Sequence, residues 1–181
     1  MTETSHGPHP KFQVVGAAGR MLVFDSSDER SASRETRDTG IHVDGDNPHV
    51  VLEQLAELLD EQTVCFVGKG RLALAALEAA DRASAASIRI ILEAPDGLTP
   101  AHLSWAGRSG TLQRSDILIL TGSAATLDSG ATARLVKSHL PRATLMFVYG
   151  AEDDIAHDRP DLYLEAVQDF LRRGSGFVIR N

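Results

Sequence analysis

The sequence lacks the features that mark several classes of protein. It contains one cysteine, Cys65, so no disulfide can form within the chain. No apolar run approaches the ~20 residues that a membrane-spanning helix needs, and the first ten residues have neither the basic region nor the apolar stretch of a secretory leader. Basic residues are not in excess, because 18 Lys and Arg face 25 Asp and Glu, which gives a formal net charge of −7. We therefore expect a cytoplasmic protein that binds neither nucleic acid nor membranes.

The composition that remains is that of a globular domain, with 43% hydrophobic and 24% charged residues. A length of 181 residues fits one domain. Residues 1–10 contain Gly7, Pro8 and Pro10 and no apolar residue except Met1, so they cannot bury enough surface to become ordered. The sequence predicts a disordered tail over 1–10 and a single domain over 11–181.

The first part of this domain has an irregular pattern. Two short apolar runs, FQVV and MLVF, flank a glycine-containing segment and predict two strands joined in a hairpin. Residues 25–47 are polar and longer than an ordinary connection, which is typical of a functional or a mobile loop. From Pro48 to Asp60 the apolar positions have helical spacing, with the proline in the first turn. We expect a helix there.

From residue 63 onward the pattern predicts alternating strands and helices. The apolar strand runs do not alternate with polar residues, which indicates strands covered on both faces. The fold class is therefore α/β, a mostly parallel sheet flanked by helices. The predicted strands are 63–67, 88–92, 117–121 and 143–148. The predicted helices are 70–82, 130–139 and 159–172, with one more short helix near 100–106 inside an irregular link over 93–115.

One predicted strand runs through glycines directly into a helix, in the segment VCFVGKGRLAL. Such a turn brings backbone N–H groups to the carboxyl edge of the sheet, where an anion or a reacting group can be held. A first hypothesis is that Lys69, Gly70 and Arg71 bind a small anionic ligand.

A second hypothesis takes the same turn as a dinucleotide fingerprint. Gly68-x-Gly70-x-x-Ala73 has the required spacing, and Glu93 follows about 20 residues later, where a ribose-binding acid belongs. The turn comes after about 60 residues of other structure, whereas the fingerprint normally opens its βαβ unit. NAD-type binding is thus one alternative function.

Residues 47–172, about two-thirds of the chain, resemble the core of the α/β-hydrolase family. The segment VCFVGKGRLALAAL is similar to the strand, nucleophile elbow and helix of that family, and ILILTGSAATL is similar to the strand before its catalytic acid. The segment ATLMFVYGAEDDIAHDRPDLYLEAVQDFL is similar to its last strand, histidine loop and closing helix. The resemblance implies a minimal α/β-hydrolase-like core without a cap domain, because the link over 93–115 is short.

The resemblance places the nucleophile, the acid and the histidine of the hydrolase triad at Gly70, Ala125 and Asp154. None of these three residues can supply the expected chemistry. The resemblance therefore implies a catalytically degenerate protein that acts by binding a ligand or a protein, without cofactor or metal. The alternative is a residual hydrolase, similar to an esterase or a thioesterase, with Ser123 and His157 as the replacement pair. A repurposed enzyme such as a cyclase, which needs no nucleophile, belongs to the same alternative.

Four further expectations concern residues around this core. Ser26 and Ser27 are additional nucleophile candidates near the place of the missing oxyanion loop. The residues Glu152, Asp153, Asp154 and Asp158 predict a solvated acidic loop rather than a metal site. Cys65 is expected to be a buried, unreactive thiol. Trimming of the fold predicts exposed apolar surface and hence a homo-oligomer or a protein partner, with the GFVIR run at 176–180 as a candidate edge strand.

Overall fold

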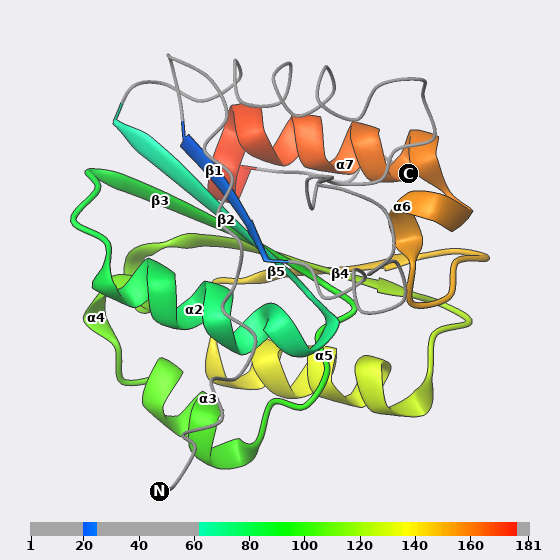
Figure 1. Cartoon of the computed structure of the whole chain (residues 1–181), viewed down its shortest axis with the longest axis horizontal. Coiled ribbons are helices and arrows are strands. Elements are labelled where there is room, and N and C mark those ends of the chain that lie inside the picture. Colours follow the sequence, from blue (N-terminus) through cyan, green and yellow to red (C-terminus); the bar gives the residue numbers. More distant parts are fainter. Residues whose placement is uncertain (1–19, 25–61, 177–181) are drawn as a thin grey trace, which may run out of the picture.

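The structure is a computed structural model that describes residues 20–24 and 62–176 (Figure 1). The strands are β1 (Arg20–Phe24), β2 (Thr63–Lys69), β3 (Ser87–Glu93), β4 (Asp116–Gly122) and β5 (Thr144–Val148). The α-helices are α2 (Ala73–Arg82), α3 (Pro100–Ala106), α4 (Gly110–Arg114), α5 (Leu127–His139), α6 (Ile155–Asp158) and α7 (Pro160–Arg173). Two short 3₁₀ turns, η2 (Gly70–Leu72) and η3 (Gly174–Gly176), precede α2 and follow α7.

The five strands form one parallel sheet in the order β1-β2-β3-β4-β5. Each strand therefore lies beside the strand that precedes it in the described chain. The register pairs the last residues of neighbouring strands, Lys69 with Glu93 and Gly122 with Val148. Because the strands are parallel, all of their carboxyl ends lie along one side of the sheet, which we call the carboxyl edge.

Helices cover both faces of the sheet (Figure 1). The apolar sides of α2, α3, α4 and α5 pack against one face, around the strand residues Phe66, Ile90 and Ile119. Helices α6 and α7 pack against the other face, around Met21 and Leu118. Apolar residues at successive strand positions thus enter two different cores, which explains the continuous apolar runs in the sequence. The predicted fold class, an α/β fold with a parallel sheet between helices, is confirmed.

The predicted elements from residue 63 onward agree with the structure except at short or polar segments. Each predicted strand is found with its ends displaced by at most two residues, and the short helix near 100–106 is α3. The link over 93–115 contains a second helix, α4, whose five residues are too few to show a helical period. Helix α5 begins three residues before the predicted start, because Thr126 caps it and accepts a hydrogen bond from the Ser129 N–H.

Several predictions lie outside the described residues: the tail over 1–10, the FQVV strand, the loop over 25–47, the helix from Pro48 to Asp60 and nearly all of the GFVIR run. The MLVF run forms most of β1, which pairs in parallel with β2. Among the helices of the described ranges, none is long and apolar enough to cross a membrane.

Candidate functional site

The candidate site lies at the carboxyl edge, where the loops that follow the strands gather. Strand β2 ends there at Lys69 and β3 ends at Glu93, directly beside it. The segments that follow β4 and β5 begin at Ser123 and Tyr149 on the same side of the sheet. Parallel strands thus bring together side chains that are far apart in the sequence.

The turn after β2 has the backbone form of an elbow. Gly70 has a φ of +53°, in the left-handed region that glycine adopts without strain. A Cβ at Gly68 would lie 2.8 Å from the Cβ of Ala76 and 2.9 Å from the Cα of Ala73, so only glycine allows α2 to pack this closely on the strand. A Cβ at Gly70 would meet no atom within 4 Å. Position 70 therefore faces open space, but it carries no side chain that could react there.

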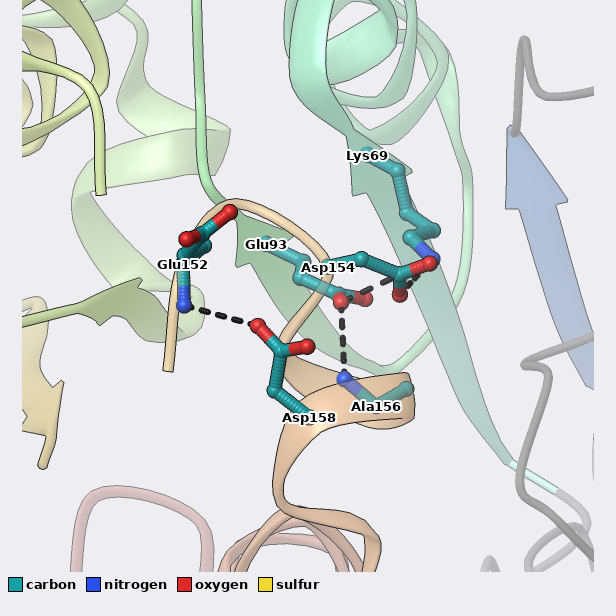
Figure 2. A network of polar contacts seen from close by, with 6 residues as sticks. All are labelled: Lys69, Glu93, Glu152, Asp154, Ala156 and Asp158. Atoms are coloured by element: carbon teal, nitrogen blue, oxygen red, sulfur yellow. Dashed lines mark hydrogen bonds and ion pairs between the residues drawn. The ribbon is translucent and has the colours of Figure 1, made fainter. Parts of the chain in front are cut away.

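Three charged side chains meet beside the elbow, and we call Lys69, Glu93 and Asp154 the Lys69 cluster (Figure 2). The Nζ of Lys69 lies 3.6 Å from Oε1 of Glu93 and 3.3 Å from Oδ1 of Asp154. The side chain of Glu93 is 0% exposed and that of Lys69 is 12% exposed, whereas that of Asp154 is 56% exposed. The backbone N–H of Ala156, in α6, also donates to Oε1 of Glu93, over 3.3 Å. Since a buried carboxylate is unfavourable unless it is paired and hydrogen-bonded, Lys69 and Ala156 both stabilise Glu93.

Two other carboxylates of the acidic loop, those of Asp153 and Asp158, accept hydrogen bonds from backbone and hydroxyl groups of the chain. Oδ1 of Asp153 accepts hydrogen bonds from the Ser129 hydroxyl at 2.7 Å and from the Thr126 N–H at 3.4 Å, at the start of α5. Oδ2 of Asp158 accepts from the Glu152 N–H at 2.8 Å (Figure 2). Within the residues that the structure describes, no group of three or more His, Cys, Asp or Glu side chains is arranged to hold a metal ion.

The structure places the three residues that the resemblance assigns to the triad as follows. Gly70 forms the elbow. Asp154 contacts Lys69, which directly precedes Gly70 in the sequence. Ala125 lies in the loop after β4, where its N–H donates to the carbonyl of Gly122 at 3.3 Å. Asp154 is thus close to the elbow, while Ala125 contributes only its backbone and a methyl group.

The structure does not join Ser123 and His157, the candidate replacement pair. The Ser123 hydroxyl accepts a hydrogen bond from the Gly150 N–H at 2.9 Å. His157 is an exposed residue of α6 whose backbone N–H donates to the Asp154 carbonyl. Neither residue is hydrogen-bonded to the other in the described part of the chain. Ser26 and Ser27 lie outside the described residues.

The residues of the anion-site and dinucleotide hypotheses have other contacts. The ammonium of Lys69 faces two carboxylates, while Arg71 is 86% exposed and its Nε lies 3.7 Å from Oδ2 of Asp96. Lys69 and Arg71 therefore do not converge on one point. Glu93 is buried beneath α6, whereas a carboxylate that binds a ribose must be accessible to it. Binding of an anion or a dinucleotide at this turn stays a prediction.

Cys65 lies in β2 with no exposed surface. Burial raises the pKa of its thiol from 9.0 to about 12, although the positive charge of Arg89 lowers it in part. The group therefore stays protonated and unreactive at neutral pH, because the thiolate is the reactive form. This agrees with the expectation of a structural thiol.

A hollow lined by Ser87, Thr111, Arg114 and Asp116 lies at the opposite end of the sheet. Strand β3 runs from Ser87 at that end to Glu93 at the carboxyl edge. The hollow is therefore separated from the Lys69 cluster by the length of the strand and is not part of the candidate site.

No known family and no curated protein matches this sequence. The structure is similar to that of a predicted CIB-like hydrolase from Thermoplasma acidophilum, with a TM-score of 0.54 and 18% identity over 77% of this chain and 67% of that chain. An esterase from Pyrococcus furiosus gives a TM-score of 0.47 and 12% identity, over 73% of this chain and 66% of that chain. This chain thus spans about two thirds of the length of these proteins. The likeness to the Thermoplasma protein, at this level of identity, shows the fold alone, which is α/β-hydrolase-like.

Proposed function

We propose that the protein is an α/β-hydrolase-like chain without the hydrolytic triad, which acts by binding at its carboxyl edge. The observation that carries this proposal is the elbow. Gly70 has the left-handed backbone of a nucleophile elbow and faces open space, but it offers no hydroxyl or thiol. The fold thus keeps the shape of the turn and lacks its reacting group.

The charges around the elbow support the same conclusion. A hydrolase needs a base that activates the nucleophile and a third group that orients the base. Here Asp154 is paired with Lys69, and Ala125 has no charge. Lys69 is paired with both Glu93 and Asp154, so the cluster suits a structural role beneath a binding surface better than proton transfer.

The first experiment asks whether any serine is activated. We expect the full chain to hydrolyse short acyl esters no faster than buffer does, and to take up no serine-reactive fluorophosphonate. The Gly70→Ser variant should also lack efficient turnover, because its partners are still absent. The matched control is Ser123→Ala, which should leave the background rate unchanged.

Stoichiometric labelling of one serine by the fluorophosphonate, lost in a single variant such as Ser123→Ala or Ser26→Ala, would refute the proposal. It would instead support the alternative, a residual or repurposed hydrolase. Mass spectrometry of the labelled peptide identifies the serine, including those outside the described residues.

A second experiment separates the ligand classes by calorimetry with inorganic phosphate and with NAD. If the turn binds anions, phosphate gives heat and Arg71→Ala weakens its binding. Arg71 is suited to this test because its side chain is exposed and its removal leaves the Lys69 cluster in place. Absence of heat with NAD at millimolar concentration would remove the dinucleotide hypothesis.

A further inference from the structure

The side of the sheet formed by β5 combines apolar exposure with an open strand edge. Within the described residues β5 is the last strand in the sheet order and pairs only with β4. The large apolar side chains that the structure exposes are Leu127 at 91%, Phe147 at 44% and Tyr149 at 82%. They belong to the first residue of α5, to β5 itself and to the residue that follows β5. Phe147 and Tyr149 therefore lie at or beside this edge, and Leu127 begins the helix that packs over β4 and β5.

The sequence of β5 has none of the features that keep sheet edges from pairing. The strand reads TLMFV and contains no charge, proline or glycine. Edge strands are usually protected by inward or flanking charges, by proline or by bulges, since their free N–H and C=O groups accept another strand. The Arg134 guanidinium lies 5.1 Å from the centre of the Phe147 ring and covers one side of it, yet the ring stays partly exposed.

We propose that β5 pairs with β5 of a second copy of this chain, in antiparallel orientation about a two-fold axis at Met146. The observation that points to a second copy is the self-complementarity of the strand. With this register Met146 faces Met146 of the second copy, Leu145 faces Phe147 and Thr144 faces Val148. Every one of these cross-strand pairs is uncharged, and directly opposed residues contact each other on the same face of the sheet.

The charges of α5 fit the same arrangement. Helix α5 lies on the face of the sheet to which Leu145 and Phe147 point, next to β5. Its first turn carries the acidic Asp128, and its second half carries the basic Arg134 and Lys137. A two-fold axis perpendicular to the sheet places the two α5 helices side by side and antiparallel. The acidic end of each helix then faces the basic half of the other, which attracts, whereas a parallel arrangement would bring like charges together.

This proposal is independent of binding at the carboxyl edge, because β5 pairing uses neither the elbow nor the Lys69 cluster. The first test is light scattering on the full chain between about 1 and 100 µM. We expect twice the chain mass of 19.5 kDa. Phe147→Lys should weaken the dimer by about 100-fold, because each dimer contains the substituted residue twice, each time opposite Leu145 of the other copy. The matched control is Ala101→Lys, which adds the same charge at an exposed position of α3 and should leave the mass unchanged.

The second test reads the register by oxidative crosslinking. Opposed residues of antiparallel strands have Cβ atoms about 5 Å apart, within reach of a disulfide, so Met146→Cys should form a covalent dimer. Leu145→Cys should not, since the proposed register places the two introduced thiols on a diagonal of roughly 8 Å. Both variants alter a partly buried residue of β5, and the native Cys65 is buried and should not react.

A wild-type chain that stays monomeric at 100 µM would overturn the proposal. It would also be overturned by a dimer in which Met146→Cys crosslinks no faster than Leu145→Cys. Truncation after Gly174 separates a second copy from the chain's own C-terminus as the occupant of the edge. Two results together would assign the interface to the GFVIR run instead of β5. The truncated chain would be a monomer, and Met146→Cys in the full chain would form a dimer that does not crosslink.

Discussion

Removal of the Lys69 ammonium should be the most destabilising change of a single charge at the carboxyl edge. In Lys69→Met the apolar stem is kept and only the positive charge is lost, so the fully buried Glu93 carboxylate loses its ion pair. Removing one partner of a buried ion pair lowers the free energy of unfolding by about 3–5 kcal/mol. The variant can limit this cost by taking up a proton, and protonating an ordinary glutamate at pH 7 costs about 4 kcal/mol. The remaining hydrogen bond from Ala156 reduces the effect further. We expect a loss of about 3 kcal/mol in the free energy of unfolding.

Two companion variants show whether burial is the cause. Asp154→Asn removes the other partner of Lys69, but that carboxylate is 56% exposed, so its loss should change stability by less than about 1 kcal/mol. Adding Glu93→Gln to Lys69→Met removes the uncompensated charge and should restore most of the lost stability. Chemical denaturation with urea measures all four proteins, and a non-additive double variant reports the coupling directly.

The reasoning would be refuted by equal and small effects of Lys69→Met and Asp154→Asn. Glu93 would then be stabilised without Lys69.

Two further predictions concern β2 and the elbow. Gly68→Ala should lower the free energy of unfolding by about 2 kcal/mol, since its Cβ would overlap the backbone of α2, while Gly70→Ala should cost about 1 kcal/mol of backbone strain only. Equal urea midpoints for these two variants would contradict the argument. The folded thiol of Cys65 has a pKa raised from 9.0 to about 12, so the unfolded chain loses this proton first and stability should fall as the pH rises above 9. Between pH 9 and 10.5 the free energy of unfolding, measured with urea, should fall by about 1.5 kcal/mol more for the wild type than for Cys65→Ala. If the free energies of the two proteins change in parallel with pH, this prediction is wrong.

The parallel sheet could be predicted from the sequence because each strand is buried on both faces. Runs such as IRIIL and ILILT are apolar at successive positions, and only a sheet between two helical layers buries both sides of such a strand. Helix α7 was equally clear, since Tyr163, Val167 and Phe170 repeat at helical spacing and are buried. The missed elements lack such a pattern. Helix α4 has only five residues, too few to show a helical period. The first turn of α5 contains Ser129 and Gly130, so the start of α5 is defined by capping rather than by apolar spacing.

The candidate site was harder to predict because its contacts depend on strand order and loop path. Lys69 and Glu93 are the last residues of two strands that are consecutive in the described chain, so a parallel sheet with neighbours in sequence order would have placed them side by side. The sequence hypothesis that involves Glu93 assigns it to a dinucleotide site, and it does not include this pairing with Lys69. The resemblance implies that Asp154 lies near the elbow, but its ion pair with Lys69 does not follow from the sequence, because it depends on the turn at Gly150, where φ is +73°, and on the path of the chain into α6.

The Lys69 cluster explains how the carboxyl edge can stay folded around a fully buried carboxylate, that of Glu93. A buried polar group is unfavourable unless its neighbours satisfy it, so charged side chains at the edge of a sheet must stabilise one another. Asp154, which the resemblance places at the histidine position, contacts Lys69. Lys69 in turn joins the ends of β2 and β3 to the segment that begins α6, where Ala156 binds the same carboxylate. These contacts thus tie the ends of β2 and β3 to the segment that follows β5, and they supply the ordered carboxyl edge that the proposed binding function requires.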